Sequence, residues 1–205
     1  MATRPATLWV AFHYSPLPHP ALSMTIIRPS QPGDLPAITA IYGHHVLHGT
    51  GTFETEPPDL PEMTQRRLDV LGKGLPYLVA VSGDRVVGYA YCTWFKPRPA
   101  YRFSAEDSVY IAHDVKAQGL GRALLSELCA QAEKAGIRKL IAVIGDSNNL
   151  GSVGVHRAVG FTPVGVLKSC GWKFDQWLDV VLMEKALGVG DSQPAALSGS
   201  SAPNK

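Results

Sequence analysis

The chain has 205 residues, of which 45% are hydrophobic and 18% are charged, with a formal net charge of +2. This length suits one domain with a sizeable core plus tails, and the near-balanced charge predicts no general attraction to nucleic acid or to a membrane. The three cysteines, Cys92, Cys129 and Cys170, are odd in number and widely spaced, form no metal or disulfide pattern, and favour a reducing cytoplasm.

Both ends of the chain differ in composition from its middle. Residues 1–23 are rich in proline, and their short apolar patch does not match a secretory signal. Met24 looks like a natural start, so 1–23 is interpreted as a disordered extension. Residues 188–205 are rich in Gly, Ser, Ala and Pro, a composition typical of disorder. The working domain is therefore predicted over residues 24–187.

The first half of this domain predicts antiparallel strands and two helices. Asp34 is placed to cap the first helix, and Gly72 and Gly74 end the second. Ser82-Gly83-Asp84 separates two apolar runs and predicts a β-hairpin. The predicted strands cover 25–28, 77–81 and 85–93, and the predicted helices cover 35–46 and 61–71.

The second half predicts a strand, a long helix and a further strand, in the order of a βαβ unit. A β-branched, aromatic run gives the strand, and apolar residues at helical spacing give the helix, which Gly136 ends. The strands are predicted at 108–112, 139–144, 164–167 and 177–184, and a short helix at 152–159. The whole domain is therefore predicted as a mixed α/β fold.

A glycine-containing loop, Gln118-Gly119-Leu120-Gly121-Arg122-Ala123, joins the 108–112 strand to the long helix. Glycines at a helix start let backbone N–H groups approach an anion at the positive end of the helix dipole. Gly121-Arg122-Ala123 lacks the lysine of a P-loop, and a dinucleotide fingerprint would need a glycine where Leu124 stands. The loop therefore indicates another phosphate-bearing cofactor, with a simple tight turn as the alternative.

The pattern Gln-x-x-Gly-x-Ala resembles the pyrophosphate loop of the GCN5-related N-acetyltransferase (GNAT) family. A second segment, Asn149-Leu150-Gly151-Ser152 followed by His156 and Gly160-Phe161, resembles that family's second cofactor motif in order and spacing. The resemblance implies the GNAT acyl-CoA N-acyltransferase fold, a mixed central sheet flanked by helices. It also implies acetyl-CoA as co-substrate and no metal.

The resemblance further implies which residues hold the cofactor. Backbone groups of one strand would contact the pantetheine amides and polarise the thioester, the glycine loop would wrap the pyrophosphate, and the second motif would hold the pantetheine arm. These residues are Val109, Tyr110 and Ile111; Ala117, Gln118, Gly119, Leu120, Gly121 and Arg122; and Asn149 and Ser152.

Further segments are similar to the phosphinothricin and methionine sulfoximine/sulfone acetyltransferases, which acetylate the α-amine of small amino-acid analogues. They are 51–54, 96–98, 105–110 and 177–180. The phosphinothricin enzymes carry histidines where this chain has Phe174 and Leu178, so this segment is closer to the methionine sulfoximine/sulfone type and argues against phosphinothricin as the preferred acceptor. The resemblance also implies a cytoplasmic homodimer that detoxifies such analogues.

Two residues are candidates for proton transfer. The family counterpart of Glu106 is the general base that takes a proton from the amine, and an exposed loop acid is the alternative. His156 stands where many relatives have a tyrosine near the coenzyme sulfur, so it is a candidate general acid, with a packing residue as the alternative.

The acceptor site is predicted around a basic, proline-rich loop. Lys96, Pro97 and Arg98 are candidates to clamp the acceptor's anionic or polar groups, with a solvated loop as the alternative. Asp107 and Ser108 are predicted to contact the amine. Phe53 is a candidate for an apolar wall, with Tyr101 and Phe103 in the same role or in the core.

Two further interpretations compete with this one. His44 and His48 share a helix face, but no third ligand is evident, so a metal site is not favoured. The other functions left open are a GNAT enzyme acting on another amine or a peptide N-terminus, and a non-catalytic acetyl-CoA-binding module.

Overall fold

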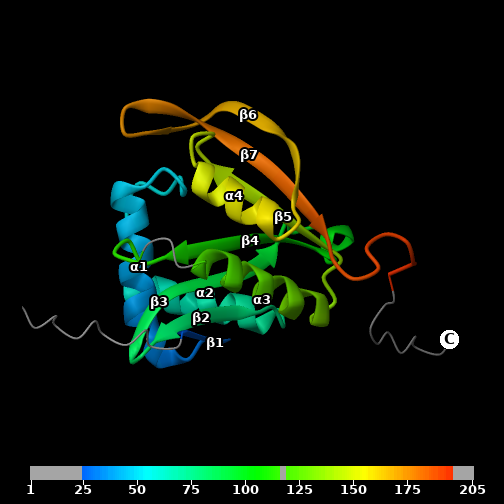
Figure 1. Ribbon diagram of the computed structural model, residues 1–205, viewed down its shortest axis with the longest axis horizontal. Helices are drawn as coiled ribbons and strands as arrows, with labels where there is room; N and C mark the ends of the chain where they lie inside the picture. The colour runs from blue at the N-terminus through cyan, green and yellow to red at the C-terminus, as the bar shows by residue number, and fades with distance from the viewer. Residues whose placement is uncertain (1–24, 116–118, 196–205) are drawn as a thin grey trace, which may run out of the picture.

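A computed structural model of the chain describes residues 25–115 and 119–195. In these ranges a seven-stranded sheet has the order β1-β2-β3-β4-β5-β7-β6, with helices packed against it (Figure 1). The strands are β1 (Thr25–Pro29), β2 (Tyr77–Ser82), β3 (Arg85–Trp94), β4 (Ser104–Ile111), β5 (Lys139–Gly145), β6 (Thr162–Lys173) and β7 (Gln176–Ala186). The helices are α1 (Leu35–His48), α2 (Leu60–Gly72), α3 (Leu120–Lys134) and α4 (Leu150–Ala158), with 3-10 turns η1 (Pro32–Asp34) and η2 (Pro99–Tyr101).

The first four strands form an antiparallel meander. The predicted hairpin is confirmed, because Ser82 pairs with Arg85 and Gly83 adopts the positive φ of 60° that a tight turn requires. β4 and β5 are parallel, so the chain must cross over between them, and α3 makes this crossover. The predicted βαβ order is therefore confirmed.

Successive residues of β3 face opposite sides of the sheet, and this alternation separates two layers of the core. Tyr89 is fully buried and stacks on Tyr91 and Tyr110 on the side of α1. Gly88 lies toward α3, where an added Cβ would come within 3.1 Å of Leu124. The sheet is thus covered by α1 and α2 on one face and by α3 on the other (Figure 1).

The start of the first helix differs from the sequence prediction. Asp34 does not cap α1 with its side chain. Its carboxylate instead accepts two hydrogen bonds of 2.8 Å from Arg28 and one of 2.7 Å from the Gln31 backbone. The bidentate guanidinium and the preceding 3-10 turn take up the oxygens that a cap would use.

The strands β4 and β6 extend furthest beyond their predicted bounds, and both extensions bear on function. β4 begins at Ser104 and therefore includes Glu106 and Asp107. β6 continues to Lys173, and the hairpin of β6 and β7 reaches beyond α4 (Figure 1). Beyond β7, Arg138 donates a hydrogen bond to the carbonyl of Gly190. None of the described helices is long and apolar enough to cross a membrane.

Candidate active site

A cavity of about 540 Å³ lies where β4 and β5 separate. The two strands pair from Ser104 with Lys139 as far as Asp107 with Ala142. Beyond that point each strand continues, and the cavity opens between them and against α1, α4 and the 49–54 segment. Its volume is that of a small-molecule or cofactor site.

The N-terminus of α3 meets one end of this cavity. Gly119 precedes the helix with a φ of 69°, a left-handed conformation that favours glycine. Gly121 lines the cavity, and an added Cβ would lie 3.5 Å from Val155 of α4. The first-turn N–H groups of Leu120, Gly121 and Arg122 have no partners within the helix, so they suit a pyrophosphate. Two predicted contacts, Ala117 and Gln118, lie outside the described residues.

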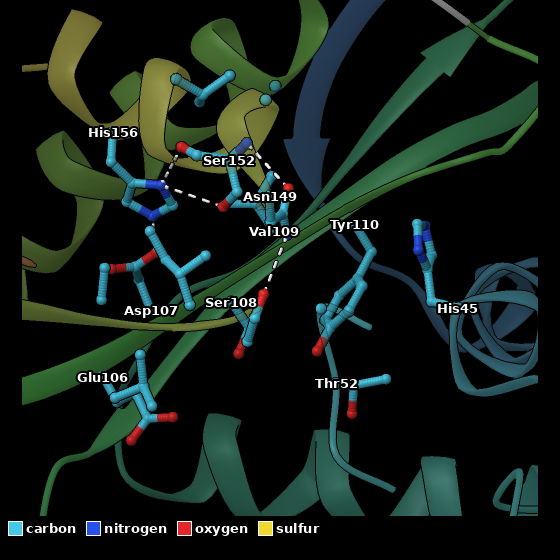
Figure 2. A pocket seen from close by; sticks show the side chains of 18 of the residues that line it. His45, Thr52, Glu106, Asp107, Ser108, Val109, Tyr110, Asn149, Ser152 and His156 are labelled. Carbon is cyan, nitrogen blue, oxygen red and sulfur yellow. Dashed lines mark hydrogen bonds and ion pairs between the residues drawn. The ribbon is translucent and has the colours of Figure 1, made fainter. Parts of the chain in front are cut away.

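The side chains of β4 alternate across the mouth of the cavity. Glu106 and Ser108 point to the face of α1 and α2, whereas Asp107 points to His156 on α4 (Figure 2). Val109, Tyr110 and Ile111 also line the cavity. The strand therefore presents both backbone groups and two different sets of side chains to the same space.

Glu106 is a partly buried carboxyl group in this cavity. Burial raises the pKa of Glu106 above its usual value, the neighbouring Asp107 raises it further, and Lys96 opposes both. A carboxylate with a raised pKa is a stronger base than one in water, and a general base works best when its pKa approaches the working pH. The alternative of an exposed loop acid does not fit, because Glu106 belongs to β4 and pairs with Thr93 and Ile141.

Asp107 and His156 form a buried pair between β4 and α4. The distance from His156 Nε2 to Asp107 Oδ2 is 2.9 Å, and the side chains are 6% and 1% exposed. His156 Nδ1 lies 2.8 Å from the Ser152 carbonyl oxygen, which can only accept. Burial lowers the pKa of His156, but the hydrogen bond and charge of Asp107 outweigh it and raise the pKa overall. Both ring nitrogens therefore lie beside acceptor oxygens, an arrangement that favours the protonated imidazolium.

The predicted pantetheine residues sit at the start of α4. Asn149 caps the helix by accepting a hydrogen bond of 3.2 Å from the Ser152 backbone. Both residues also line the cavity, in agreement with a ligand-contact role (Figure 2). The cap orients the first turn of α4 toward β4.

The 49–54 segment forms one wall of the cavity and is held in place by β6. Lys173 is 4% exposed, and its Nζ donates hydrogen bonds of 2.8 Å to the carbonyls of Gly49 and Thr52. The ring of Phe53 packs directly on Gly171, where any Cβ would collide with it. Phe53, a predicted wall residue, lines the cavity, and its position depends on these β6 residues.

Lys96, Pro97 and Arg98 are exposed and do not line the cavity. The Lys96 ammonium lies 4.9 Å from the Phe95 ring centroid, and its charge still acts on Glu106. The other predicted wall residues also lie elsewhere: Tyr101 packs edge-on against Phe95, and Phe103 lines a separate small cavity. The acceptor-clamping role of the basic loop stays a prediction.

Sequence reasoning missed several cavity residues, notably Tyr42, Glu54 and Tyr91. They come from a helix, a loop and a strand that share no local motif, so only the tertiary fold brings them together. The histidines of α1 behave differently from a metal cluster: His44 stacks on His113 with ring centroids 4.0 Å apart. Among the described residues, no group of three ligating side chains could hold a metal ion.

The sequence profile of the acetyltransferase (GNAT) domain family matches residues 27–182, which cover most of the chain. The chain belongs to this family. Acetyltransferases of this family use acetyl-CoA, and the strand separation and α3 N-terminus described above fit that co-substrate. The fold class, the enzyme class and the family predicted from the sequence are therefore confirmed.

Relatives of this acetyltransferase include enzymes with named acceptors. It is 54% identical to a phosphinothricin N-acetyltransferase of Alcaligenes faecalis, over 81% of this chain and 84% of that protein. It is 36% identical to an L-methionine sulfoximine/L-methionine sulfone acetyltransferase of Pseudomonas paraeruginosa, over 82% and 98%. A crystal structure of a phosphinothricin acetyltransferase from Sinorhizobium meliloti with AcCoA matches with a TM-score of 0.82 at 39% identity, covering 85% of this chain and 94% of that one.

Proposed function

We propose that this acetyltransferase transfers an acetyl group from acetyl-CoA to the α-amine of a small amino acid or toxic analogue such as methionine sulfoximine, methionine sulfone or phosphinothricin. The observation that carries the proposal is the partly buried Glu106 carboxyl in the cavity between β4 and β5. The relatives that act on such analogues support the acceptor class.

Glu106 acts as general base in this proposal. An α-amine has a pKa of about 8, so much of it is protonated at neutral pH and must lose a proton before it can attack. Glu106 takes this proton as the amine nitrogen becomes an amide nitrogen, directly or through one water. Acetyl-CoA, when bound, would supply the acetyl group as an activated thioester, whose C–S bond breaks so that coenzyme A leaves as a thiolate and takes up a proton.

The chain's remaining cavity residues bind and orient. The N–H groups of residues 119–122 bind the pyrophosphate, and Asn149 and Ser152 hold the pantetheine arm. Backbone groups of Val109, Tyr110 and Ile111 contact the pantetheine amides, and one N–H polarises the thioester oxygen.

The general-acid role of His156 carries a structural condition. Both of its ring nitrogens already have partners, so the ring must break one hydrogen bond before it can donate a proton elsewhere. Single-turnover rates of wild type and His156→Phe test the role. An unchanged chemical step in the variant rejects it.

A thiol-release assay over a panel of acceptors tests the proposed function. The panel contains the three analogues, a polyamine and an N-terminal peptide, and product mass identifies the acetylated amine. We expect turnover with the amino-acid analogues, and a loss of about 100-fold or more in kcat/KM for Glu106→Gln. Turnover confined to the polyamine or peptide refutes the acceptor class, and a fully active Glu106→Gln refutes the base.

We also propose a cytoplasmic homodimer. The proposal of a dimer is supported by large apolar side chains exposed along the β6–β7 hairpin, because exposed apolar patches mark interaction sites. They are Val164, Val166, Leu167, Trp172, Phe174 and Trp177. The location is supported by three free thiols, at Cys92, Cys129 and Cys170. Light scattering of the purified protein measures its mass and tests the dimer.

A further inference from the structure

Besides Glu106 and Asp107, a third carboxylate, that of Glu54, lines the cavity. It lines the cavity together with Glu106, Tyr42 and Tyr91. Tyr91 is in electrostatic reach of both acids and of Arg66: burial is the main cause of its raised pKa, the hydrogen bond with Ser108 and the charge of Arg66 lower the pKa, and Glu106 and Glu54 raise it further. Burial, with a further contribution from Glu54, also raises the pKa of Tyr42 to about 12. The cavity lining therefore carries the carboxylates of Glu54 and Glu106 in addition to that of Asp107, which is paired with His156.

Arg66 fixes the Glu54 carboxylate from outside the cavity. Its guanidinium donates to both oxygens of Glu54, at 2.7 Å and 3.2 Å, and lies 5.9 Å from the centroid of the Tyr42 ring. Arg66 also binds Glu62, one turn earlier on α2. The residues that line the cavity, all of them in the described ranges, include no lysine or arginine. The Glu54 carboxylate thus lines the cavity, whereas its cationic partner Arg66 does not.

We propose that Glu54 is a specificity-determining residue that favours acceptors with an uncharged side-chain head and disfavours acceptors with an anionic one. The inference rests on the proposed function and adds the charge class of the acceptor. Three analogues with nearly the same tetrahedral shape separate the effects. Methionine sulfoximine is neutral with an N–H donor, methionine sulfone is neutral without one, and phosphinothricin carries an anionic phosphinate.

The charge of Glu54 acts on these heads in a predictable direction. A carboxylate repels the phosphinate, whereas it accepts a hydrogen bond from the sulfoximine N–H and leaves the sulfone without a donor to bind. All three acceptors share the α-amine and the α-carboxylate, so ratios of kcat/KM cancel every contribution except that of the head. The ratios therefore report on Glu54 even when absolute rates change.

The test is Glu54→Gln, which keeps the shape and removes the charge. We expect kcat/KM for phosphinothricin relative to sulfone to rise about tenfold, the effect of one partly neutralised like charge. The sulfoximine-to-sulfone ratio stays within about twofold, because the amide oxygen still accepts a hydrogen bond. The matched control is Glu62→Gln, which removes an equivalent partner of Arg66 outside the cavity and leaves both ratios unchanged.

The outcomes separate the inference from the proposed function. Turnover of all three analogues with the same ratios in wild type, Glu54→Gln and Glu62→Gln overturns the inference alone. Absence of turnover with every analogue overturns the proposed function and the inference with it. If Glu54→Gln does not fold, a salt titration of the wild-type enzyme takes the place of the variant. Raising the ionic strength from about 0.05 to about 0.5 M screens the repulsion and should increase kcat/KM for phosphinothricin relative to sulfone. A flat salt profile overturns the inference.

Discussion

Asp107→Asn should destabilise the fold by breaking the buried pair between β4 and α4. The substitution keeps the size of the side chain and removes the charge that holds His156 as an imidazolium. The two residues are 49 positions apart in sequence, so the pair contributes a long-range link between the strand that carries Glu106 and the helix that lines the cavity. Losing the pair leaves a buried ring beside a neutral amide.

The magnitude follows from burial. Removing one partner of a buried ion pair costs about 3–5 kcal/mol, and a hydrogen bond to a charged group contributes about 1.5–3 kcal/mol. Asparagine can still form one neutral hydrogen bond, so we expect a loss of about 3 kcal/mol in the free energy of unfolding. For a chain of this size that loss lowers Tm by about 9 °C.

The cost should depend on pH in one direction. The folded-state pKa of His156 is raised above its ordinary 6.5, so the pair's contribution is complete below about 6.5 and is lost as the pH rises through the folded-state pKa. Urea titrations of wild type and Asp107→Asn at about pH 6 and about pH 9 measure this. The difference between the two proteins should be larger at the lower pH.

An exposed ion pair provides the control. Asp114 and Arg85 lie 2.7 Å apart with side chains 46% and 56% exposed, so Asp114→Asn should change stability by less than about 1 kcal/mol. An Asp107→Asn cost as small as that of the control, or one that grows with pH, refutes the imidazolium assignment of His156.

Two further substitutions test how the ends of the cavity are built. Gly119→Ala places a Cβ on a residue with a φ of 69°, so it should lower the free energy of unfolding by about 1–2 kcal/mol and raise the KM for acetyl-CoA. Gly154→Ala is the control, because a Cβ there meets open space on α4, and it should be neutral or stabilising in the same urea titrations. Lys173→Met leaves the carbonyls of Gly49 and Thr52 without their donor, so it should lower the free energy of unfolding by about 1–3 kcal/mol. It should also raise the acceptor KM more than the acetyl-CoA KM. Steady-state kinetics that show both KM values unchanged contradict this prediction.

The helix starts at the cavity could be predicted from sequence because their signals are local. Gly119 and Gly121 mark a strand-to-helix turn, and Asn149 begins a helix three residues before Ser152, so short segments carry the pattern. The order of elements followed for the same reason. Hydrophobic periodicity and turn residues are properties of neighbouring residues.

The cavity wall formed by the 49–54 segment depends on contacts between residues far apart in the sequence. Hydrophobic periodicity cannot reveal such contacts. Lys173 looks like a solvent-exposed residue before a turn, yet it is buried against the 49–52 backbone. Glu54 and Arg66 are charged residues of a kind common on surfaces, and only the tertiary fold brings them together beside Tyr42. The prediction of Asp34 as a helix cap is wrong because Arg28, on the preceding strand β1, binds its carboxylate.

The pairing of β4 has a consequence for how the empty protein behaves. β4 lies fourth in a seven-stranded sheet, yet its pairing with β5 stops at Asp107, so Ser108–Ile111 have a β-ladder only with β3. This central half-strand should show the amide hydrogen exchange of a sheet edge, faster than that of residues 104–107. A ligand that supplies amide partners there finishes the sheet, so acetyl-CoA should slow exchange along Ser108–Ile111 and raise the melting temperature together.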